Sequence, residues 1–447
     1  MPLLEPVELV DPHALGPVHF IAIGGAGMSG IAAAYRQAGI RVTGSDQVDS
    51  PALDWLRALG IEVHVGHEIG QLGDAQTVVI SSAVREANVE LAAARARGLR
   101  VWHRSAALAA LMLDRRGIAV SGTHGKTTTS AMIAWMLAKL GADPSFVLGA
   151  PLAGSVSSYL GNGELFVVEA DESDGSFLQY PAEVAVITNV EADHLDNWKT
   201  AQAYRAGFVR FACAATVKDV VLSGADKVTP QLCADLERTG KRVHVAQPGE
   251  PMDLLVPGVH NQRNAAQAQA VGVLLGYGAA EIQAALGSFP GTERRFQTVA
   301  RFAPWEGQPE VWIVDDYAHH PTEVRATLEA ARSVAPGRVM ACFQPHLFTR
   351  TRDFADEFGK ALALADVVVV LDIYPAREDP IPGVTGALVA DAAALAGAEV
   401  QYVPELDDAP ERLAALVRPG DLVLTLGAGS VTQVGPKLAA RLEAGDV

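Results

Sequence analysis

A chain of 447 residues, of which 49% are apolar and 19% charged, predicts a folded protein of two or three domains and excludes extended disorder. Its net charge of −17 argues against nucleic acid or an anionic membrane as a partner. The first 17 residues lack a signal-peptide pattern, and no run of about 18 uncharged apolar residues predicts a membrane span. The three cysteines are too far apart for a disulfide framework or a zinc site, so we expect a cytoplasmic protein without membrane insertion.

Short β-branched strands alternate with amphipathic helices along the whole chain, separated by glycine or polar turns. This rhythm predicts an α/β protein with mostly parallel sheets. In the first block we expect a helix over residues 31–38. The expected strands of this block are 19–23, 41–45, 62–65 and 78–81.

A polar break at residues 114–117 ends the first block, and a Pro- and Gly-bearing stretch at residues 288–296 ends the second. Helices are expected from residue 126 to about 140 and over 322–331. The strands expected in these two blocks are 118–121, 165–170, 184–189, 311–317, 338–343, 367–373 and 422–426. We therefore predict three domains: a Rossmann-like domain over 1–114, a P-loop ATPase-type domain over 115–293 and a C-terminal Rossmann-like domain over 294–447.

The first chemical motif is Gly25-Ala-Gly-Met-Ser-Gly30, which follows a strand, opens a helix and has Asp46 at the end of the next strand. This context is typical of a dinucleotide fingerprint, in which glycines let a diphosphate approach the backbone at a helix N-terminus. A glycine-rich turn that only packs helix on strand is the structural alternative. The motif indicates a nucleotide diphosphate more strongly than it indicates NAD.

A second glycine-rich loop, Ser121-Gly-Thr-His-Gly-Lys-Thr-Thr-Thr129, lies between an apolar strand and a helix start. This is the pattern of a phosphate-binding loop, in the shorter G-x-x-G-K-T form. Lys126 would bridge the terminal phosphates of a nucleotide, and the Thr127 hydroxyl would reach Mg²⁺.

Two acidic segments follow later strands. In Glu169-Ala-Asp-Glu-Ser-Asp174, four carboxylates would repel one another unless a cation or basic side chain sits among them, and Glu169 is the one we expect to hold Mg²⁺. In the segment from Thr188 to Asp196, His194 could be a second metal ligand. Because Mg²⁺ prefers oxygen, a histidine that only hydrogen-bonds its loop remains the alternative.

The last part of the chain carries amides, arginines and histidines near strand ends. Asn261 and Asn264 would share a helix face. Arginines at a hinge and acids at the next strand end could meet a nucleotide when domains close, although surface salt bridges are the alternative. These residues lie in Arg294-Arg295, Asp315-Asp-Tyr-Ala-His-His-Pro321, Gln344-Pro-His-Leu-Phe-Thr-Arg-Thr-Arg352 and Gly427-Ala-Gly-Ser430.

In this order and over nearly the whole chain, the motifs resemble those of the Mur ligase family. The segments that carry the resemblance are 24–30, 122–128, 169–174, 193–196, 260–264, 294–296, 315–321 and 372–379. The resemblance implies ATP-dependent formation of an amide bond by way of an acyl phosphate, in peptidoglycan synthesis. Within the family it favours the branch that joins L-alanine to UDP-N-acetylmuramate, with ATP as co-substrate, magnesium or manganese as the metal, and a monomer or homodimer as the assembly.

The resemblance also implies roles for individual residues. The first domain would bind the UDP-sugar, through Gly24, Gly25, Ala26, Gly27, Met28, Ser29, Gly30 and Asp46. The nucleotide would bind to Gly122, Thr123, His124, Gly125, Lys126, Thr127, Thr128, Asn261, Asn264, Arg295 and Asp316. The catalytic set would be Lys126, Glu169, His194, Arg295 and Asp316; the metal ligands Thr127, Glu169 and His194; and the residues for the amino acid His319, His346 and Arg350.

One departure concerns a lysine that several sister ligases carbamylate to bridge magnesium. An alignment without gaps places Phe208 there, and phenylalanine cannot carry a carbamate. The alanine-adding branch is thought to lack the modified lysine too, so the departure favours that branch.

Three rival functions remain. A recycling ligase that attaches a preformed tripeptide to the same UDP-sugar shares most of these motifs. An NAD(P)-dependent oxidoreductase would use the loop at Gly25–Gly30 with Asp46 but leaves the loop at Gly122–Thr128 unexplained. A nucleotide switch or binding protein would have no amide chemistry.

Overall fold

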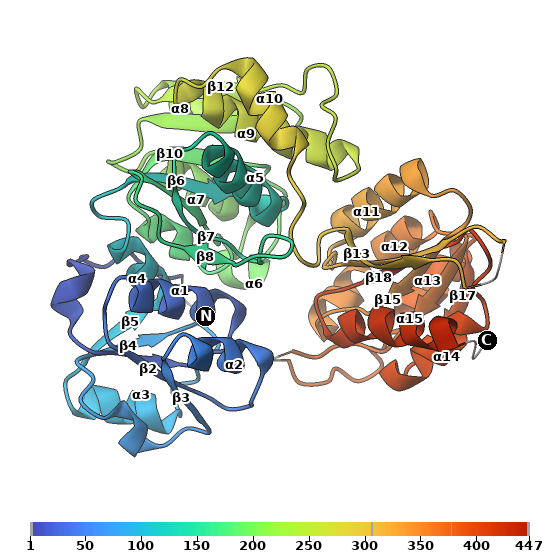
Figure 1. Cartoon of the computed structure of the whole chain (residues 1–447), viewed down its shortest axis with the longest axis horizontal. Coiled ribbons are helices and arrows are strands. Elements are labelled where there is room, and N and C mark those ends of the chain that lie inside the picture. Colours follow the sequence, from blue (N-terminus) through green and yellow to red (C-terminus); the bar gives the residue numbers. More distant parts are fainter. Residues whose placement is uncertain (1–2, 305–306, 377, 445–447) are drawn as a thin grey trace. The chain divides into compact units, whose positions relative to one another are not determined.

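The computed structural model describes residues 3–304, 307–376 and 378–444, without the side chains of Ala26 and Asp196. It contains three mostly parallel sheets flanked by helices, which confirms the predicted fold class (Figure 1). The chain forms two compact units. The larger holds the first two sheets, and the smaller holds the third. Their bounds are Met1–Asp253 with Gln262–Phe289, and Leu254–Asn261 with Pro290–Val447.

The first sheet has five parallel strands in the order β3-β2-β1-β4-β5. The strands are β1 (Val18–Ile21), β2 (Val42–Asp46), β3 (Glu62–Val65), β4 (Thr77–Ile80) and β5 (Arg100–His103), and the helices α1 (Ala26–Gln37), α2 (Pro51–Ala58), α3 (Val89–Ala96) and α4 (Arg104–Ala110). The strand order reverses at β1, and the loop after a strand at such a point is where doubly wound sheets bind ligands. The first glycine-rich motif begins in that loop and continues into α1.

The second sheet has seven strands in the order β12-β11-β10-β6-β9-β7-β8, with only β8 antiparallel to its neighbour. The strands are β6 (Arg116–Ser121), β7 (Ser145–Val147), β8 (Ser158–Tyr159), β9 (Leu165–Glu169), β10 (Ala182–Ile187), β11 (Asp219–Ser223) and β12 (Arg242–Ala246). The helices are α5 (Lys126–Lys139), α6 (Leu195–Trp198), α7 (Ala201–Ala212), α8 (Thr229–Glu237), α9 (Val259–Leu274) and α10 (Ala279–Gly287). Since β6 lies between β9 and β10, the loops that follow these three strands share one edge of the sheet.

The third sheet has six strands in the order β13-β14-β18-β15-β16-β17, of which β13 alone runs antiparallel. The strands are β13 (Gln297–Phe302), β14 (Val311–Asp316), β15 (Val339–Phe343), β16 (Val367–Val370), β17 (Glu399–Tyr402) and β18 (Leu422–Leu426). The helices are α11 (Pro321–Val334), α12 (Phe348–Leu362), α13 (Ala387–Leu395), α14 (Ala409–Ala414) and α15 (Val434–Ala444). Here β14, β18 and β15 are neighbours, so their carboxyl ends meet.

The cores follow from the strand pattern, because central strands of parallel sheets are buried on both faces. One continuous apolar cluster joins the first two sheets of the larger unit. In the smaller unit, α11, α12 and α13 cover one face of the sheet, and α14 and α15 cover the other.

The structure corrects some expected bounds. The predicted polar break at 114–117 is wrong in its second half, because Arg116 and Gly117 begin β6 and pair with β9. The strand β13 lies beyond the predicted second linker and was not foreseen. None of the described helices combines the length and apolar character needed to cross a bilayer.

Candidate active site

The predicted phosphate-binding loop connects β6 to α5, as expected. Gly122 has φ of 138°, and a Cβ there would lie 2.0 Å from Thr188 Oγ1. Gly125, the N-cap of α5, is left-handed with φ of 80°. Both positions favour glycine. The loop therefore delivers the positive end of a 14-residue helix to the edge of the sheet.

Residues after β10 hold this loop in shape. The backbone N–H of Thr123 donates to the Asn189 carbonyl at 3.1 Å, and that of His124 donates to Asn189 Oδ1 at 3.0 Å. In return Asn189 Nδ2 and Thr188 Oγ1 donate to the His124 carbonyl, at 2.8 and 2.6 Å. The conformation of the loop is thus stabilised by the segment that follows β10, the strand next to β6.

Lys126 folds back onto its own loop. Its Nζ donates to the carbonyls of Gly122 at 2.6 Å and Thr123 at 3.1 Å, and to Glu172 Oε1 at 3.1 Å; Glu172 Oε2 lies 2.9 Å away. Burial lowers the pKa of Lys126, but the charge of Glu172 and neighbouring carboxylates outweighs it and raises that pKa. Burial raises the pKa of Glu172 to about 7, although Lys126 opposes the shift.

The four carboxylates of the segment from Glu169 to Asp174 point to different partners. Glu169 Oε2 accepts from Gly149 N at 2.8 Å, and Asp171 accepts from Arg104 at 2.9 Å. Glu172 faces Lys126, and Asp174 Oδ2 accepts from Ser82 at 2.5 Å and lies 3.8 Å from the His103 ring. A cation or a basic side chain among these carboxylates was expected, and the structure supplies Arg104 for Asp171 and Lys126 for Glu172.

The predicted metal ligands lie around the same edge. Thr127 is in the first turn of α5, Glu169 ends β9, and His194 stands before α6 with a left-handed φ of 52°. The His194 ring lies 3.5 Å from Asp193 Oδ2 and 3.9 Å from Glu172 Oε1. The hydroxyl of Thr127 and the carboxylate of Glu169 provide oxygen ligands of the kind that Mg²⁺ prefers. The neighbouring carboxylates would stabilise a bound cation.

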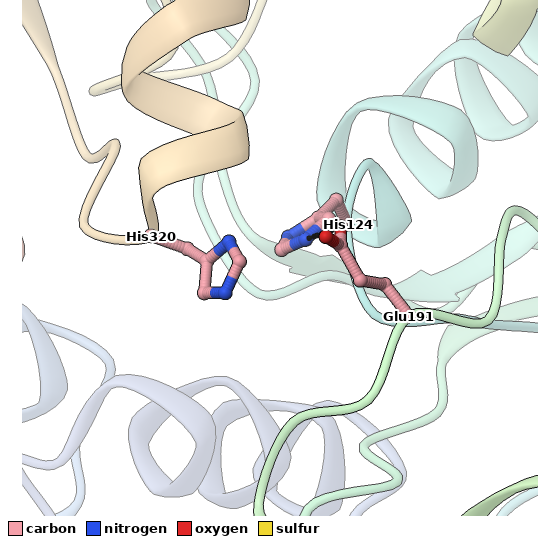
Figure 2. A group of neighbouring side chains, drawn as sticks. All are labelled: His124, Glu191 and His320. Atoms are coloured by element: carbon pink, nitrogen blue, oxygen red, sulfur yellow. Dashed lines mark hydrogen bonds and ion pairs between the residues drawn. The ribbon is translucent and has the colours of Figure 1, made fainter. Parts of the chain in front are cut away.

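His124 takes part in a separate contact with the loop after β10. Figure 2 shows its ring directed at Glu191, with Nε2 3.0 Å from Glu191 Oε2. Glu191 also binds the loop through its backbone, because its N–H donates to Thr123 Oγ1 and its carbonyl accepts from the same hydroxyl, both at 2.9 Å. His320, also drawn in Figure 2, is the N-cap of α11 in the smaller unit.

In the first glycine-rich loop, several predicted binding groups are used internally. Gly24 N donates to Asp46 Oδ2 at 2.8 Å, so the Asp46 carboxylate stabilises the loop itself. Gly25 N donates to the Ala22 carbonyl at 3.2 Å. Met28 and Ser29 are buried residues of α1. The side chain of Ala26 lies outside the description.

The later glycines of this motif lie on α1 and face other parts of the larger unit. A Cβ on Gly27 would lie 3.0 Å from Arg104 Nη1, and one on Gly30 would lie 3.4 Å from Ser157 and Ser158 of the second sheet. Gly30 therefore places α1 against Ser157 and the start of β8, at a distance that a Cβ would also tolerate. Gly27 allows a guanidinium to lie against the loop.

Asn261 and Asn264 lie on α9, which confirms the expected helix. Both side chains are almost fully buried. Asn261 Nδ2 donates to the Pro257 carbonyl at 2.7 Å. A Cβ on Gly125 would lie 2.8 Å from Asn264 Oδ1, so Asn264 is adjacent to the phosphate-binding loop.

In the smaller unit, the arginines of the predicted hinge meet the end of β14. Arg294 donates to Asp315 at 3.0 Å, and both Arg294 and Arg295 stack over the Tyr317 ring. Asp316 accepts from the backbone N–H groups of Phe296 and Ala318, both at 2.8 Å. Burial raises the pKa of Asp316 to about 6, against the opposing charge of Arg295.

The predicted amino-acid residues gather at the ends of β14 and β15. The rings of His319 and His346 are 5.8 Å apart, and His346 stacks on Tyr374 at 5.8 Å. His319 Nδ1 lies 3.2 Å from Glu323 Oε2. Arg350 lies in the first turn of α12. The motif at 372–379 includes Arg377, which lies outside the described residues.

Three residues near the two glycine-rich loops, from other elements, were not assigned a role from the sequence. They are Arg104, Asn189 and Tyr204; Tyr204 donates to Glu172 Oε1 at 3.2 Å. Phe208, which an alignment without gaps places at the position of the lysine of sister ligases, is fully buried and packs edge-on against Tyr204 and Phe177. It cannot provide a metal ligand.

Three family models match the chain in series. They are "Mur ligase family, catalytic domain" over residues 17–116, "Mur ligase middle domain" over 120–247 and "Mur ligase, glutamate ligase domain" over 294–429. Together they span all three sheets.

Individual relatives agree with these models. The chain is 56% identical to a UDP-N-acetylmuramate–L-alanine ligase of Cutibacterium acnes, and the match covers 99% of both chains. It resembles the crystal structure of a UDP-N-acetylmuramate-alanine ligase from Thermotoga maritima, with a TM-score of 0.80, 28% identity and coverage of 96% and 99%. A murein peptide ligase from Psychrobacter arcticus matches with a TM-score of 0.69, 23% identity and coverage of 96% and 99%, a likeness that shows the fold alone.

Proposed function

The chain belongs to the Mur ligase family, and from that premise we propose that it is an ATP-dependent ligase joining L-alanine to the lactyl carboxylate of UDP-N-acetylmuramate in peptidoglycan synthesis. The observation that carries this proposal is the 56% identity, over 99% of both chains, to a ligase of that name. The products would be ADP, phosphate and the alanyl UDP-sugar.

The chemistry follows from the properties of the acid. A carboxylate is a poor acyl donor because its leaving group would be oxide. Transfer of the γ-phosphoryl group of ATP gives an acyl phosphate, and the amine of alanine then displaces phosphate to form the amide. Positioning and charge stabilisation are the main tasks of the protein in such a reaction.

The phosphate-binding loop supplies the positioning for the nucleotide. The N-terminus of α5 and the ammonium of Lys126 would bind the β- and γ-phosphates. Asn264 is next to Gly125 and would contact the same nucleotide. The other proposed nucleotide residues, Asn261, Arg295 and Asp316, belong to the smaller unit.

This division predicts that the two units close on the substrates. Small-angle scattering should show a smaller radius of gyration with an ATP analogue and the UDP-sugar bound. An unchanged radius would contradict the assignment of Arg295 and Asp316 to the nucleotide.

Magnesium would be held by Thr127 and Glu169, with His194 as a further ligand, and manganese could replace it. Bound there, the ion would neutralise charge on the phosphates. The two oxygen donors suit this ion, and the buried carboxylates beside them favour a cation.

The smaller unit would bind the incoming amino acid. The guanidinium of Arg350 and the imidazole of His346 suit its carboxylate. His319, whose ring lies beside Glu323, is our proposal for the group that accepts the proton of the alanine ammonium. We also propose a monomer or homodimer that acts in the cytoplasm, where ATP and nucleotide sugars are available.

One experiment tests the function. Purified protein is incubated with ATP, Mg²⁺ and UDP-N-acetylmuramate, with either L-alanine or the preformed tripeptide, and the products are identified by mass spectrometry. We expect the alanyl product, with omission of ATP as the control. A product formed only with the tripeptide would indicate the recycling ligase, and no amide formation coupled to ATP hydrolysis with either amine would refute the proposal.

A further inference from the structure

The hydrogen-bonding capacity of the Lys126 ammonium is already used inside the loop. An ammonium has three N–H donors, and Nζ meets three acceptors: the carbonyls of Gly122 and Thr123 and the carboxylate of Glu172. A phosphate that binds Lys126 must therefore displace at least one of them. Among the three, the carboxylate carries the full negative charge and is the strongest competitor.

The carboxylate of Glu172 is held in place and is shielded from water. Its side chain is 0% exposed. Its backbone carbonyl accepts from Trp198 Nε1 at 2.9 Å, and the Trp198 ring packs edge-on against Phe177 and Tyr204. When Lys126 turns to a phosphate, the carboxylate stays buried and loses its closest cation, which costs free energy.

We propose that Glu172 is a positioning residue that competes with the nucleotide phosphates for the Lys126 ammonium and so weakens nucleotide binding. The inference rests on the proposed function, because the phosphates are those of its ATP and ADP. It differs from a purely structural role for Glu172 in the sign of the expected effect. Loss of a structural support would weaken nucleotide binding, whereas loss of a competitor strengthens it.

Substitution of Tyr204 provides an independent test, because its expected effect on nucleotide affinity has the opposite sign. Its hydroxyl donates to Glu172 Oε1 at 3.2 Å and lies 3.0 Å from Thr123 Oγ1. This hydrogen bond stabilises the carboxylate whether or not Lys126 is present. Without it, Glu172 depends more on Lys126, and the lysine should be harder to recruit to a phosphate.

The test is calorimetric titration of the full-length protein with ADP, once in EDTA and once with Mg²⁺. In EDTA no metal is bound, so a change in ADP affinity there cannot arise from an effect on the nearby metal ligands. We expect Glu172→Gln to bind ADP about tenfold more tightly than the unmodified protein in EDTA, since a charged acceptor is replaced by a neutral one. Tyr204→Phe should bind ADP about threefold more weakly, and this loss should vanish when Glu172→Gln is also present.

Glu183→Gln is the matched control. It makes the same change of charge on β10 of the same sheet, where Glu183 pairs with Arg116 at 3.0 Å, and it should leave the affinity for ADP unchanged. Thermal denaturation shows that each variant is folded.

The outcomes separate the inference from the function it rests on. Unchanged or weaker ADP binding by folded Glu172→Gln would overturn the inference. If that variant does not fold, Tyr204→Phe decides, and tighter or unchanged binding there would overturn it. Failure of the unmodified protein to bind ADP at all, with or without Mg²⁺, would count against the proposed function instead.

Discussion

The two glycine-rich loops of the larger unit share a backbone design and differ in the origin of their positive charge. Each connects a parallel strand to a helix, β1 to α1 and β6 to α5. The second loop carries its own cation, Lys126. The first has no basic residue between Gly24 and Gly30, and the guanidinium beside it, Arg104, comes from α4.

Both cations are held by consecutive residues of one acidic segment. Asp171 binds Arg104, and Glu172 binds Lys126. In a protein with a net charge of −17, this pairing keeps two cations in place at sites proposed for anionic substrates. The comparison indicates that the same segment serves both loops, although the loops belong to different sheets.

The largest expected effect is that of Lys126→Ala on turnover. Loss of a group that stabilises transferring phosphate typically lowers the rate about 10²- to 10³-fold, and we expect a fall of at least that size in alanine-dependent ADP release. Because the change leaves Glu172 buried without its cation, Lys126→Ala with Glu172→Gln should recover stability but not activity. Near-normal turnover of the Lys126→Ala variant would show that Lys126 takes no part in the mechanism.

The second prediction separates the adjacent carboxylates by pH. Burial raises the pKa of Glu172 from 4.5 to about 7, so the folded protein binds more protons than the unfolded chain between these values. Its unfolding free energy should therefore fall as pH rises through this window, by about 3 kcal/mol from this group. Urea denaturation from pH 4.5 to 8 should show the fall in the unmodified protein, and a smaller fall in Glu172→Gln.

Asp171 should behave in the opposite sense. Burial acts to raise its pKa, but the charges of Arg104 and Lys126 outweigh it and hold that pKa below the ordinary value. The stability from Asp171 is then present above pH 3.8 and lost on acidification. Asp171→Asn should reduce the acid-induced loss of stability, and identical pH profiles for the two variants would contradict the assignment of the carboxylates to different cations.

The difference between the loops also shows what the sequence could predict. The strand, the glycines and Lys126 are local in sequence, so the second loop was predictable, whereas its contact with Glu172, 46 residues away, was not. Arg104, Asn189 and Tyr204 reach the loops only through tertiary packing, and no spacing rule connects them to either motif. Nor could a pattern show that Asp171 and Glu172 face different loops, because the regular alternation of a strand ends at Glu169.

The same reasoning applies to the fold. Most central strands of the three sheets were found because their apolar, β-branched runs are continuous. The strands β5, β7, β8, β11, β12 and β17 were missed, although every residue of β7 and β11 is buried. The antiparallel edge strand β13 was missed because Gln297 and Arg301 interrupt its apolar pattern beside a predicted linker. The first loop was predicted to bind a UDP-sugar, and the hydrogen bond from Gly24 N to Asp46 shows that Asp46 supports the loop.

The third prediction asks whether Arg104 supplies charge to the first loop. Arg104→Ala should raise KM for the UDP-sugar about tenfold, the typical loss for one charged hydrogen bond, and raise KM for ATP much less. Arg116→Ala is the matched control, because Arg116 forms comparable ion pairs with Glu164 and Glu183 on the second sheet. Equal rises in both KM values would show that Arg104 only supports the unit as a whole.

The smallest effect should come from Gly27→Ala near the first loop, which can be compared with Gly122→Ala in the second. A Cβ on Gly27 would meet only the end of the Arg104 side chain, at 3.0 Å, and a flexible guanidinium can shift by a few tenths of an ångström. Gly27→Ala should therefore change KM for the UDP-sugar about twofold and leave stability nearly unchanged. At Gly122 a Cβ would lie 2.0 Å from Thr188 Oγ1 and 3.0 Å from the Asn189 backbone, with φ of 138°, so Gly122→Ala should cost about 1–3 kcal/mol of unfolding free energy from strain alone. Comparable losses of stability in the two variants, measured by urea denaturation, would mean that the first loop is as tightly constrained as the second.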